Sequence, residues 1–153
     1  MTGHEITIET TAGQLKGISA GGVSTFLGIP YGDSVSRDLR FTAPRPHPAW
    51  SGIREATTFG PAAPQSDPRI GCSNEFYEVL RLLYPGVPSP LEGRAMGEDA
   101  LVLNVWSSTA DTGSKPVMVW LHGGGFVHGT GAEGWFQGDR LAARFRTGSH
   151  IKV

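Results

Sequence analysis

A glycine triplet at residues 123–125 lies between His122 and Phe126, and this five-residue motif directly follows an apolar run at residues 116–121. Glycine has no side chain to shield the backbone, so successive N–H groups can turn toward a bound group and donate hydrogen bonds to it. An oxyanion hole consists of hydrogen-bond donors that are already in place around the position where negative charge develops. The sequence therefore predicts an oxyanion-binding loop at this point of the chain.

His122 is the residue of this motif whose side chain could act as a general base. A general base needs a nucleophile within hydrogen-bond reach, and the sequence offers no partner serine. We therefore interpret His122 and Gly123 as supporting residues of the glycine turn. The five histidines show no spacing typical of a metal site, and Cys72 is the single cysteine. No metal and no cofactor are expected.

Two further patterns match known motifs but lack the surroundings that those motifs need. Ser19 lies in a G-x-S-x-G pattern, which marks a nucleophile only between a strand and a helix. The residues after Ser19 indicate a turn and a second strand instead. Residues 129–134 match G-x-G-x-x-G, but seven residues separate them from the preceding apolar run, which is more typical of a loop than of a dinucleotide site.

The elements that must position the loop are predicted to be mostly short strands. Residues 6–11, 14–18 and 23–29 are rich in β-branched or alternating apolar residues and are separated by glycine turns. This pattern indicates a small antiparallel meander. Residues 99–106 predict another strand. The continuous apolar run at residues 116–121 is typical of a strand covered on both faces.

Prolines and glycines gather between the meander and the later strands, at residues 30–65, and disfavour regular helix there. Large apolar residues recur in this segment, which favours packing on the protein over a disordered linker. The residues expected to anchor it are Phe41, Trp50, Ile53 and Phe59. Two helices are predicted, over residues 73–84 and 139–146.

The charge balance argues against two classes of partner. The sequence contains 13 Lys and Arg residues and 14 Asp and Glu residues, which gives a formal net charge of −1. Without a basic excess we expect no nucleic-acid partner, and without an apolar stretch of about 20 residues we expect no membrane partner. The first residues lack the features of a secretory signal. Together with the single cysteine, this leads us to expect a cytoplasmic protein.

Five blocks in order along the chain resemble the type B carboxylesterase/lipase family, which includes the para-nitrobenzyl esterases and the cholinesterases. The blocks are Gly28-Ile29-Pro30-Tyr31, Arg40-Phe41 with Pro44, Pro46 and Trp50-Ser51-Gly52, Phe59-Gly60-Pro61 with Pro64-Gln65, residues 98–105, and His122-Gly123-Gly124-Gly125-Phe126. The resemblance implies an α/β class protein with the N-terminal portion of an α/β-hydrolase fold: an antiparallel meander, loops rich in proline and glycine, and the start of the central sheet.

The resemblance also implies roles for single residues. The backbone N–H groups of Gly124 and Gly125 are expected to be the oxyanion donors for a small-molecule carboxylic ester. Arg40 is expected to form a structural salt bridge with Glu98. Cys72 lies near one half of a family disulfide whose other position is Ala100 here. We therefore expect Cys72 to be unpaired.

The resemblance ends near residue 143, and residues 144–153 form a polar tail that diverges from the family pattern. We expect residues 1–153 to be the N-terminal part of a single carboxylesterase domain, with the nucleophile, acid and base absent, so that the chain alone is inactive. In the family the sheet neighbours of the strand at residues 116–121 come later in sequence, so both of its edges are expected to be unpaired. The alternatives are a non-catalytic binding module of the same fold and a chain that complements a partner containing the triad.

Overall fold

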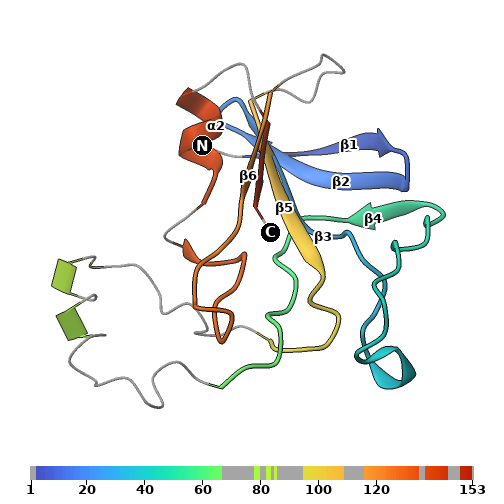
Figure 1. The fold of residues 1–153 in the computed structure, drawn as a ribbon. Helices are drawn as coiled ribbons and strands as arrows, with labels where there is room; N and C mark the ends of the chain where they lie inside the picture. Colours follow the sequence, from blue (N-terminus) through green and yellow to red (C-terminus); the bar gives the residue numbers. More distant parts are fainter. Residues whose placement is uncertain are drawn as a thin grey trace.

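A computed structural model describes residues 3–66, 78–79, 82–83, 85, 95–108, 116–134, 137–144 and 149–152. One twisted sheet dominates this part of the chain (Figure 1). Its strands are β1 (His4–Thr10), β2 (Gly13–Ala20), β3 (Val23–Pro30), β4 (Ile53–Glu55), β5 (Val102–Ser107), β6 (Val117–Trp120) and β7 (Ser149–Lys152). The helical elements with defined bounds are the 3₁₀ turn η1 (Arg37–Leu39) and the helix α2 (Asp139–Arg144).

The strands follow the order β1-β2-β3-β5-β7-β6, with β4 paired to β2 off this path. Neighbours from β1 to β7 run antiparallel along the main path, whereas β6 and β7 are parallel, as are β2 and β4. The predicted meander is confirmed as β1, β2 and β3. The strand expected from residue 99 begins only at Val102, because the Val102 N–H donates to the Ala100 carbonyl in a tight turn (2.8 Å).

A bulge in β3 turns the chain toward the proline-rich segment. The register between β3 and β5 shifts between Phe26 and Ile29. Gly28 lies inside this shift with φ +67°, a left-handed conformation that favours glycine. A Cβ atom at Gly28 would also lie 2.8 Å from the carbonyl oxygen of Thr58. Both the conformation and the close approach therefore require glycine here.

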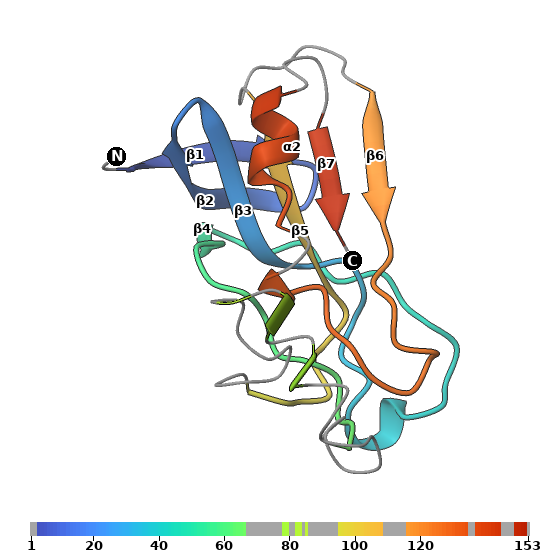
Figure 2. The same ribbon diagram turned by 90° about the vertical axis from the view of Figure 1, so that its left-hand side faces the viewer.

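The core consists of two apolar clusters on opposite faces of the sheet, because consecutive residues of β3 and β5 belong to different clusters. The first contains buried Leu15, Phe26 and Ala56, with Ile6, Ile8, Ile29, Trp50 and Val105 packed against it. The second contains buried Val23, Trp106 and Ala142, with Leu27 and Phe59 packed against it. Ala142 belongs to α2, which lies across β3 and β5 (Figure 2). The helix thus covers the middle of the sheet.

Two of the four expected anchors in the proline-rich segment are confirmed. Trp50 packs on the first cluster, and its indole N–H donates to the Gln14 carbonyl at 2.9 Å. Phe59 packs on the second cluster. The prediction is wrong for Phe41 and Ile53, both of which are exposed. Phe41 has φ +58°, which is an unusual conformation for a large side chain.

The helix prediction at residues 139–146 is confirmed as α2 for residues 139–144, while residues 145–146 lie outside the described part. Of the helix expected at residues 73–84, the described residues 78–79 and 82–83 are helical. The remainder of that helix, and Cys72 with it, lie outside the described residues. Among the residues described, no helix has both the length and the apolar character required to cross a membrane.

The prediction that both edges of the strand at residues 116–121 are unpaired is wrong. One edge of β6 is paired, because β7 from the polar tail lies beside it in a parallel register from Val117↔Ser149 to Trp120↔Lys152. Strands pair through backbone N–H and C=O groups, so a segment with polar side chains can form a paired strand as well as an apolar segment can. Neither face of β6 is covered by the described residues: its side chains are 54%, 42%, 58% and 41% exposed from Val117 to Trp120.

Candidate functional site

The glycine loop, defined here as residues 122–129, follows β6 and reverses the direction of the chain. The N–H groups of Val127 and His128 both donate to the Gly124 carbonyl, at 3.1 and 3.2 Å. Gly124, Gly125 and Phe126 all have positive φ values, of 119°, 62° and 62°. Gly124 and Gly125 adopt this left-handed conformation without strain, whereas Phe126 is a bulky residue for which it is unusual. Two of the three glycines in the triplet thus have a direct structural reason.

The two arms of the glycine loop touch each other. A Cβ atom at Gly124 would lie 1.7 Å from the His128 carbonyl oxygen. A Cβ atom at Gly129 would lie 2.5 Å from the Gly123 carbonyl oxygen and 2.6 Å from Nδ1 of His122. These distances exclude any side chain at Gly124 or Gly129. In contrast, a Cβ atom at Gly123 or Gly125 would meet nothing within 4 Å.

His122 lies against the backbone of the triplet. Its Nδ1 is 2.7 Å from the Gly123 carbonyl oxygen. Because a carbonyl oxygen only accepts, Nδ1 carries the proton in this hydrogen bond and the imidazole holds the Gly123 peptide group. The ring therefore has a local backbone contact that orients it on the loop.

The backbone N–H groups of Gly124 and Gly125 are adjacent in the glycine loop. No acceptor for either N–H occurs among the described residues. Gly125 is exposed and Gly124 is half-buried, so both groups lie at the surface of this part of the chain. Two neighbouring free donors on a backbone held by its own turn can receive a developing negative charge.

The far arm of the glycine loop is held by a side chain that sequence reasoning gave no role. The side-chain amide of Gln65 accepts a hydrogen bond from the Gly129 N–H at 2.7 Å and donates one to the Gly129 carbonyl at 2.9 Å. These two residues are 64 positions apart. The sequence contains no local signal for this contact, since Gln65 lies in a loop and its partner is a backbone group.

Asn104 links the segment after the loop to the bulge of β3. It is buried, with 2% exposure, in the middle of β5. Its Oδ1 accepts from the Gly28 N–H at 3.0 Å, and its Nδ2 donates to the Gly131 carbonyl at 3.1 Å. Sequence reasoning also missed this residue, although a signal was present: an amide within an apolar strand requires hydrogen-bond partners when it is buried.

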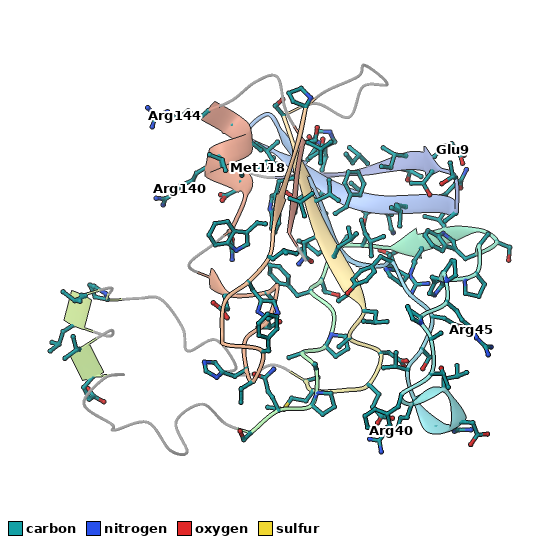
Figure 3. All side chains as sticks on the ribbon, in the orientation of Figure 1. Glu9, Arg40, Arg45, Met118, Arg140 and Arg144 are labelled. Atoms are coloured by element: carbon teal, nitrogen blue, oxygen red, sulfur yellow. The ribbon has the colours of Figure 1, made fainter. Side chains whose placement is uncertain are left out.

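Arg40 and Glu98 are brought together as an ion pair. The Arg40 side chain lies beside η1, at the end of the molecule away from α2 (Figure 3). Glu98 directly follows Gly97, whose N–H donates to the Ala62 carbonyl at 2.9 Å. Ala62 also forms an isolated parallel β-bridge with Met96. The ion pair thus lies at the end of the same bridge that leads to Gln65.

The other sequence motifs take no part in this arrangement. Ser19 lies in β2, between the antiparallel strands β1 and β3, and a turn follows it instead of a helix. A hollow of about 400 Å³ lies between α2 and the sheet, lined in part by Trp106, Phe59 and Arg140 and by no residue of the glycine loop. In the described ranges, no group of three or more His, Cys, Asp or Glu side chains is placed to hold a metal ion.

Comparison with known proteins gives consistent matches over nearly the whole chain. The Carboxylesterase family model matches residues 4–148. The phenmedipham hydrolase of Pseudarthrobacter oxydans is 40% identical over 126 residues, covering 80% of this chain and 22% of the relative. The para-nitrobenzyl esterase of Bacillus subtilis is 34% identical over 141 residues, covering 92% of this chain and 25% of the relative. The chain thus spans about a quarter of the length of these curated relatives.

Solved structures agree with the sequence matches. A para-nitrobenzyl esterase structure superposes with a TM-score of 0.73 at 33% identity, covering 95% of this chain and 27% of the other. A carboxylesterase from Geobacillus stearothermophilus gives the same TM-score and identity, with 95% and 26% coverage. The predicted N-terminal portion of an α/β-hydrolase fold is therefore confirmed, and the chain belongs to the carboxylesterase family.

Proposed function

We propose that this chain supplies the oxyanion-binding part of a carboxylic-ester hydrolase. In this proposal the N–H groups of Gly124 and Gly125 donate to the carbonyl oxygen of a small-molecule ester, while His122 and Gly123 support the loop. The observation that carries the proposal is a pair of adjacent N–H groups without an acceptor in the described residues, on a loop fixed by its own Gly124 carbonyl. The names of the relatives, a hydrolase and an esterase, support the same reaction class.

The chemistry requires groups besides these two donors. Attack of a nucleophile on the ester carbon places negative charge on the former carbonyl oxygen, and the two N–H groups stabilise that oxygen in the transition state. We propose that the nucleophilic serine, the acid and the histidine base come from outside residues 1–153. In this proposal, residues 1–153 and the part that contains these three groups form a single domain. Residues 1–153 alone are then expected to lack serine-dependent ester hydrolysis.

A chimaera tests this proposal. The matching segment of this chain would replace its counterpart in the para-nitrobenzyl esterase of Bacillus subtilis, which is 34% identical. We expect the chimaera to hydrolyse para-nitrophenyl acetate. Gly124→Ala would then lower kcat by about 10²–10³, the usual effect of losing one oxyanion donor, because its Cβ would collide with the His128 carbonyl and reshape the loop.

Gly97→Ala is the matched control, since Gly97 lies outside the glycine loop and a Cβ there makes only ordinary contacts with Pro61, at 3.7 and 3.9 Å. It should keep most of the activity of the chimaera. A folded chimaera without activity, or equal activity in the two alanine variants, would contradict the proposed role of the loop. Ester hydrolysis by residues 1–153 alone, lost in Ser19→Ala, would contradict the proposed source of the nucleophile.

A second candidate function is complementation of a polypeptide that contains the triad. The exposed apolar side chains of β6 favour it, because β7 is the strand that pairs with β6 in the described residues and neither face of β6 is covered there. Mixing this chain with the remaining segment of the esterase, expressed separately, would distinguish the two. Recovered hydrolysis from two separate chains would support complementation, and its absence beside an active chimaera would exclude it.

We also propose that the Arg40–Glu98 ion pair is structural and holds η1 against the segment that leads to β5. Its guanidinium is well exposed, with 61% side-chain exposure. An exposed pair of this kind contributes under about 1 kcal/mol to the free energy of unfolding. Its role is therefore to fix the position of a loop more than to stabilise the fold.

A further inference from the structure

We propose that Gln65 is a positioning residue for the oxyanion loop, acting through Gly129. The inference deepens the proposed function, on which it rests, by naming the side chain that fixes where the two donors lie. Gln65 does not touch the donors themselves. It binds the arm of the glycine loop that lies against them.

The hydrogen bonds of Gln65 determine the orientation of its amide. Oε1 accepts from the Gly129 N–H at 2.7 Å, and Nε2 donates to the carbonyls of Gly129 and Ala63 at 2.9 and 3.0 Å. A flipped amide would set two donors against each other and its oxygen against two carbonyl oxygens. One orientation therefore satisfies all three contacts. A residue with both a donor and an acceptor is needed at this position.

Gly129 transmits this restraint to the glycine triplet. It is buried, and its backbone lies so close to Gly123 and His122 that a Cβ atom would come within 2.6 Å of both. One position earlier, the His128 carbonyl fills the space where a Gly124 side chain would begin. A shift of Gly129 toward the triplet therefore displaces the triplet, and any shift of Gly129 also moves the His128 carbonyl, which belongs to the same peptide group. Holding Gly129 holds the peptide groups that present the donors.

The other end of the restraint is attached to the body of the protein. Gln65 lies three residues after Ala62, whose N–H donates to the Ala95 carbonyl at 3.0 Å and whose carbonyl accepts from the Gly97 N–H at 2.9 Å. Gly97 adjoins Glu98, which pairs with Arg40. The Gln65 amide thus connects the glycine loop to a bridged segment that leads directly into β5.

NMR of the full 153-residue chain labelled with ¹⁵N-glycine tests the proposal, because its readouts are the glycine amides themselves. The test variant is Gln65→Leu, which keeps the side-chain size but removes donor and acceptor. Amide exchange at Gly129 should become about tenfold faster, the factor that one net hydrogen bond contributes. The Gly124 and Gly125 signals should move, while those of Gly21 and Gly22 in the distant β2–β3 turn should not.

Gln137→Leu is the matched control, since Gln137 is exposed and lines the hollow beside α2. It should leave the Gly124, Gly125 and Gly129 signals unchanged. Unchanged Gly129 exchange in Gln65→Leu would overturn the proposal. So would faster Gly129 exchange with unmoved Gly124 and Gly125 signals, because the side chain would then hold Gly129 alone.

Gln65→Glu adds a readout that side-chain packing alone would not affect. A protonated carboxyl group has one donor and an acceptor and can restore both bonds to Gly129, whereas a carboxylate has no donor and repels the two carbonyls. The Gly124 and Gly125 signals of this variant should therefore return toward those of the unsubstituted chain as pH falls below about 4.3, the ordinary pKa of glutamate. Gly124 and Gly125 signals that do not respond to this protonation would count against the proposal. This test remains available if Gln65→Leu is poorly folded.

The experiment separates this inference from the proposed function. It contains no ester, so its outcome does not depend on catalysis. If the glycine signals respond as expected but the chimaera is inactive, positioning by Gln65 stands and the oxyanion role fails. If the chimaera is active and the signals do not respond, the oxyanion role stands and the positioning role of Gln65 fails.

Discussion

The main path of strands in the described sheet ends in two edge strands, β1 and β6, and they differ in what surrounds their side chains. Along β1, Ile6 and Ile8 turn toward the core, while Thr7 between them faces solvent. All four side chains of β6 are exposed. Met118 marks this strand in Figure 3, with the Arg140 and Arg144 side chains of α2 pointing away from the sheet.

The comparison shows that the apolar core and the candidate site are stabilised by different interactions. Around β1, β2 and β3, alternating side chains bury apolar area in the two clusters. Beyond β6, the glycine loop is held by hydrogen bonds to the backbone from Gln65 and within its own turn. Substitutions of side chains should therefore affect stability at the first region far more than at the second.

The largest expected difference is between two phenylalanines. Phe26 is 3% exposed in the first cluster, whereas Phe126 is fully exposed in the glycine loop. Phe26→Ala should lower the free energy of unfolding by about 3–5 kcal/mol, as loss of a buried aromatic does. Phe126→Ala should change it by less than about 0.5 kcal/mol. Urea unfolding of both variants measures this, and similar losses would mean that the loop side chain is buried in solution.

A smaller effect is expected on aggregation, where the two edge strands can be compared directly. An exposed apolar edge strand is prone to pair with other chains, and a lysine on it opposes that pairing. Val119→Lys on β6 should therefore slow aggregation on heating, as measured by light scattering. Thr7→Lys on the polar face of β1 should have no such effect. Equal behaviour of the two variants would show that β6 is not the aggregating edge.

The smallest effect concerns a charge on β2. The Lys16 ammonium lies 2.6 Å from the Glu55 carboxylate and 3.5 Å from that of Glu5. The hydrogen bond with Glu55, with the charge of Glu5 added, raises the pKa of Lys16 above its ordinary value of 10.5. A raised pKa means that folding favours the charged lysine, so its contribution is complete below pH 10.5 and declines as pH rises through the folded-state pKa.

Thermal unfolding of the unsubstituted chain and of Lys16→Met, followed from neutral pH to above pH 10.5, measures this contribution. The difference in Tm should shrink at the alkaline end. A constant difference would attribute the effect to the packing of the lysine stem on the sheet.

The sequence was informative where a pattern is local. The strands of the meander follow from alternation and the glycine loop from a glycine run, and each of these patterns extends over only about ten residues. The helix expected at residues 139–146 is α2 where it is described. The anchors Phe41 and Ile53 were predicted wrongly, because an apolar residue in a loop does not show which surface it faces. Pairing of β6 with β7 was also missed, since the backbone makes that contact and the polar tail has no apolar pattern to reveal it.

The contacts that hold the candidate site could be predicted less well, for the same physical reason. Asn104 offered a signal as a polar residue in an apolar strand, but its partners Gly28 and Gly131 are backbone groups of distant segments. Gln65 offered none. The sequence thus located the glycine loop and left the side chains that hold it unidentified.

The separation of these partners along the chain has a consequence for the order of folding. Asn104 and Gly28 are 76 residues apart, and Gln65 and Gly129 are 64 apart. The turns between β1, β2 and β3 close over a few residues, and a short loop costs less entropy to close than a long one. We therefore expect the meander to form early, even while the chain is being synthesised. The glycine loop takes its final shape only after residue 129 has been made and has returned to Gln65.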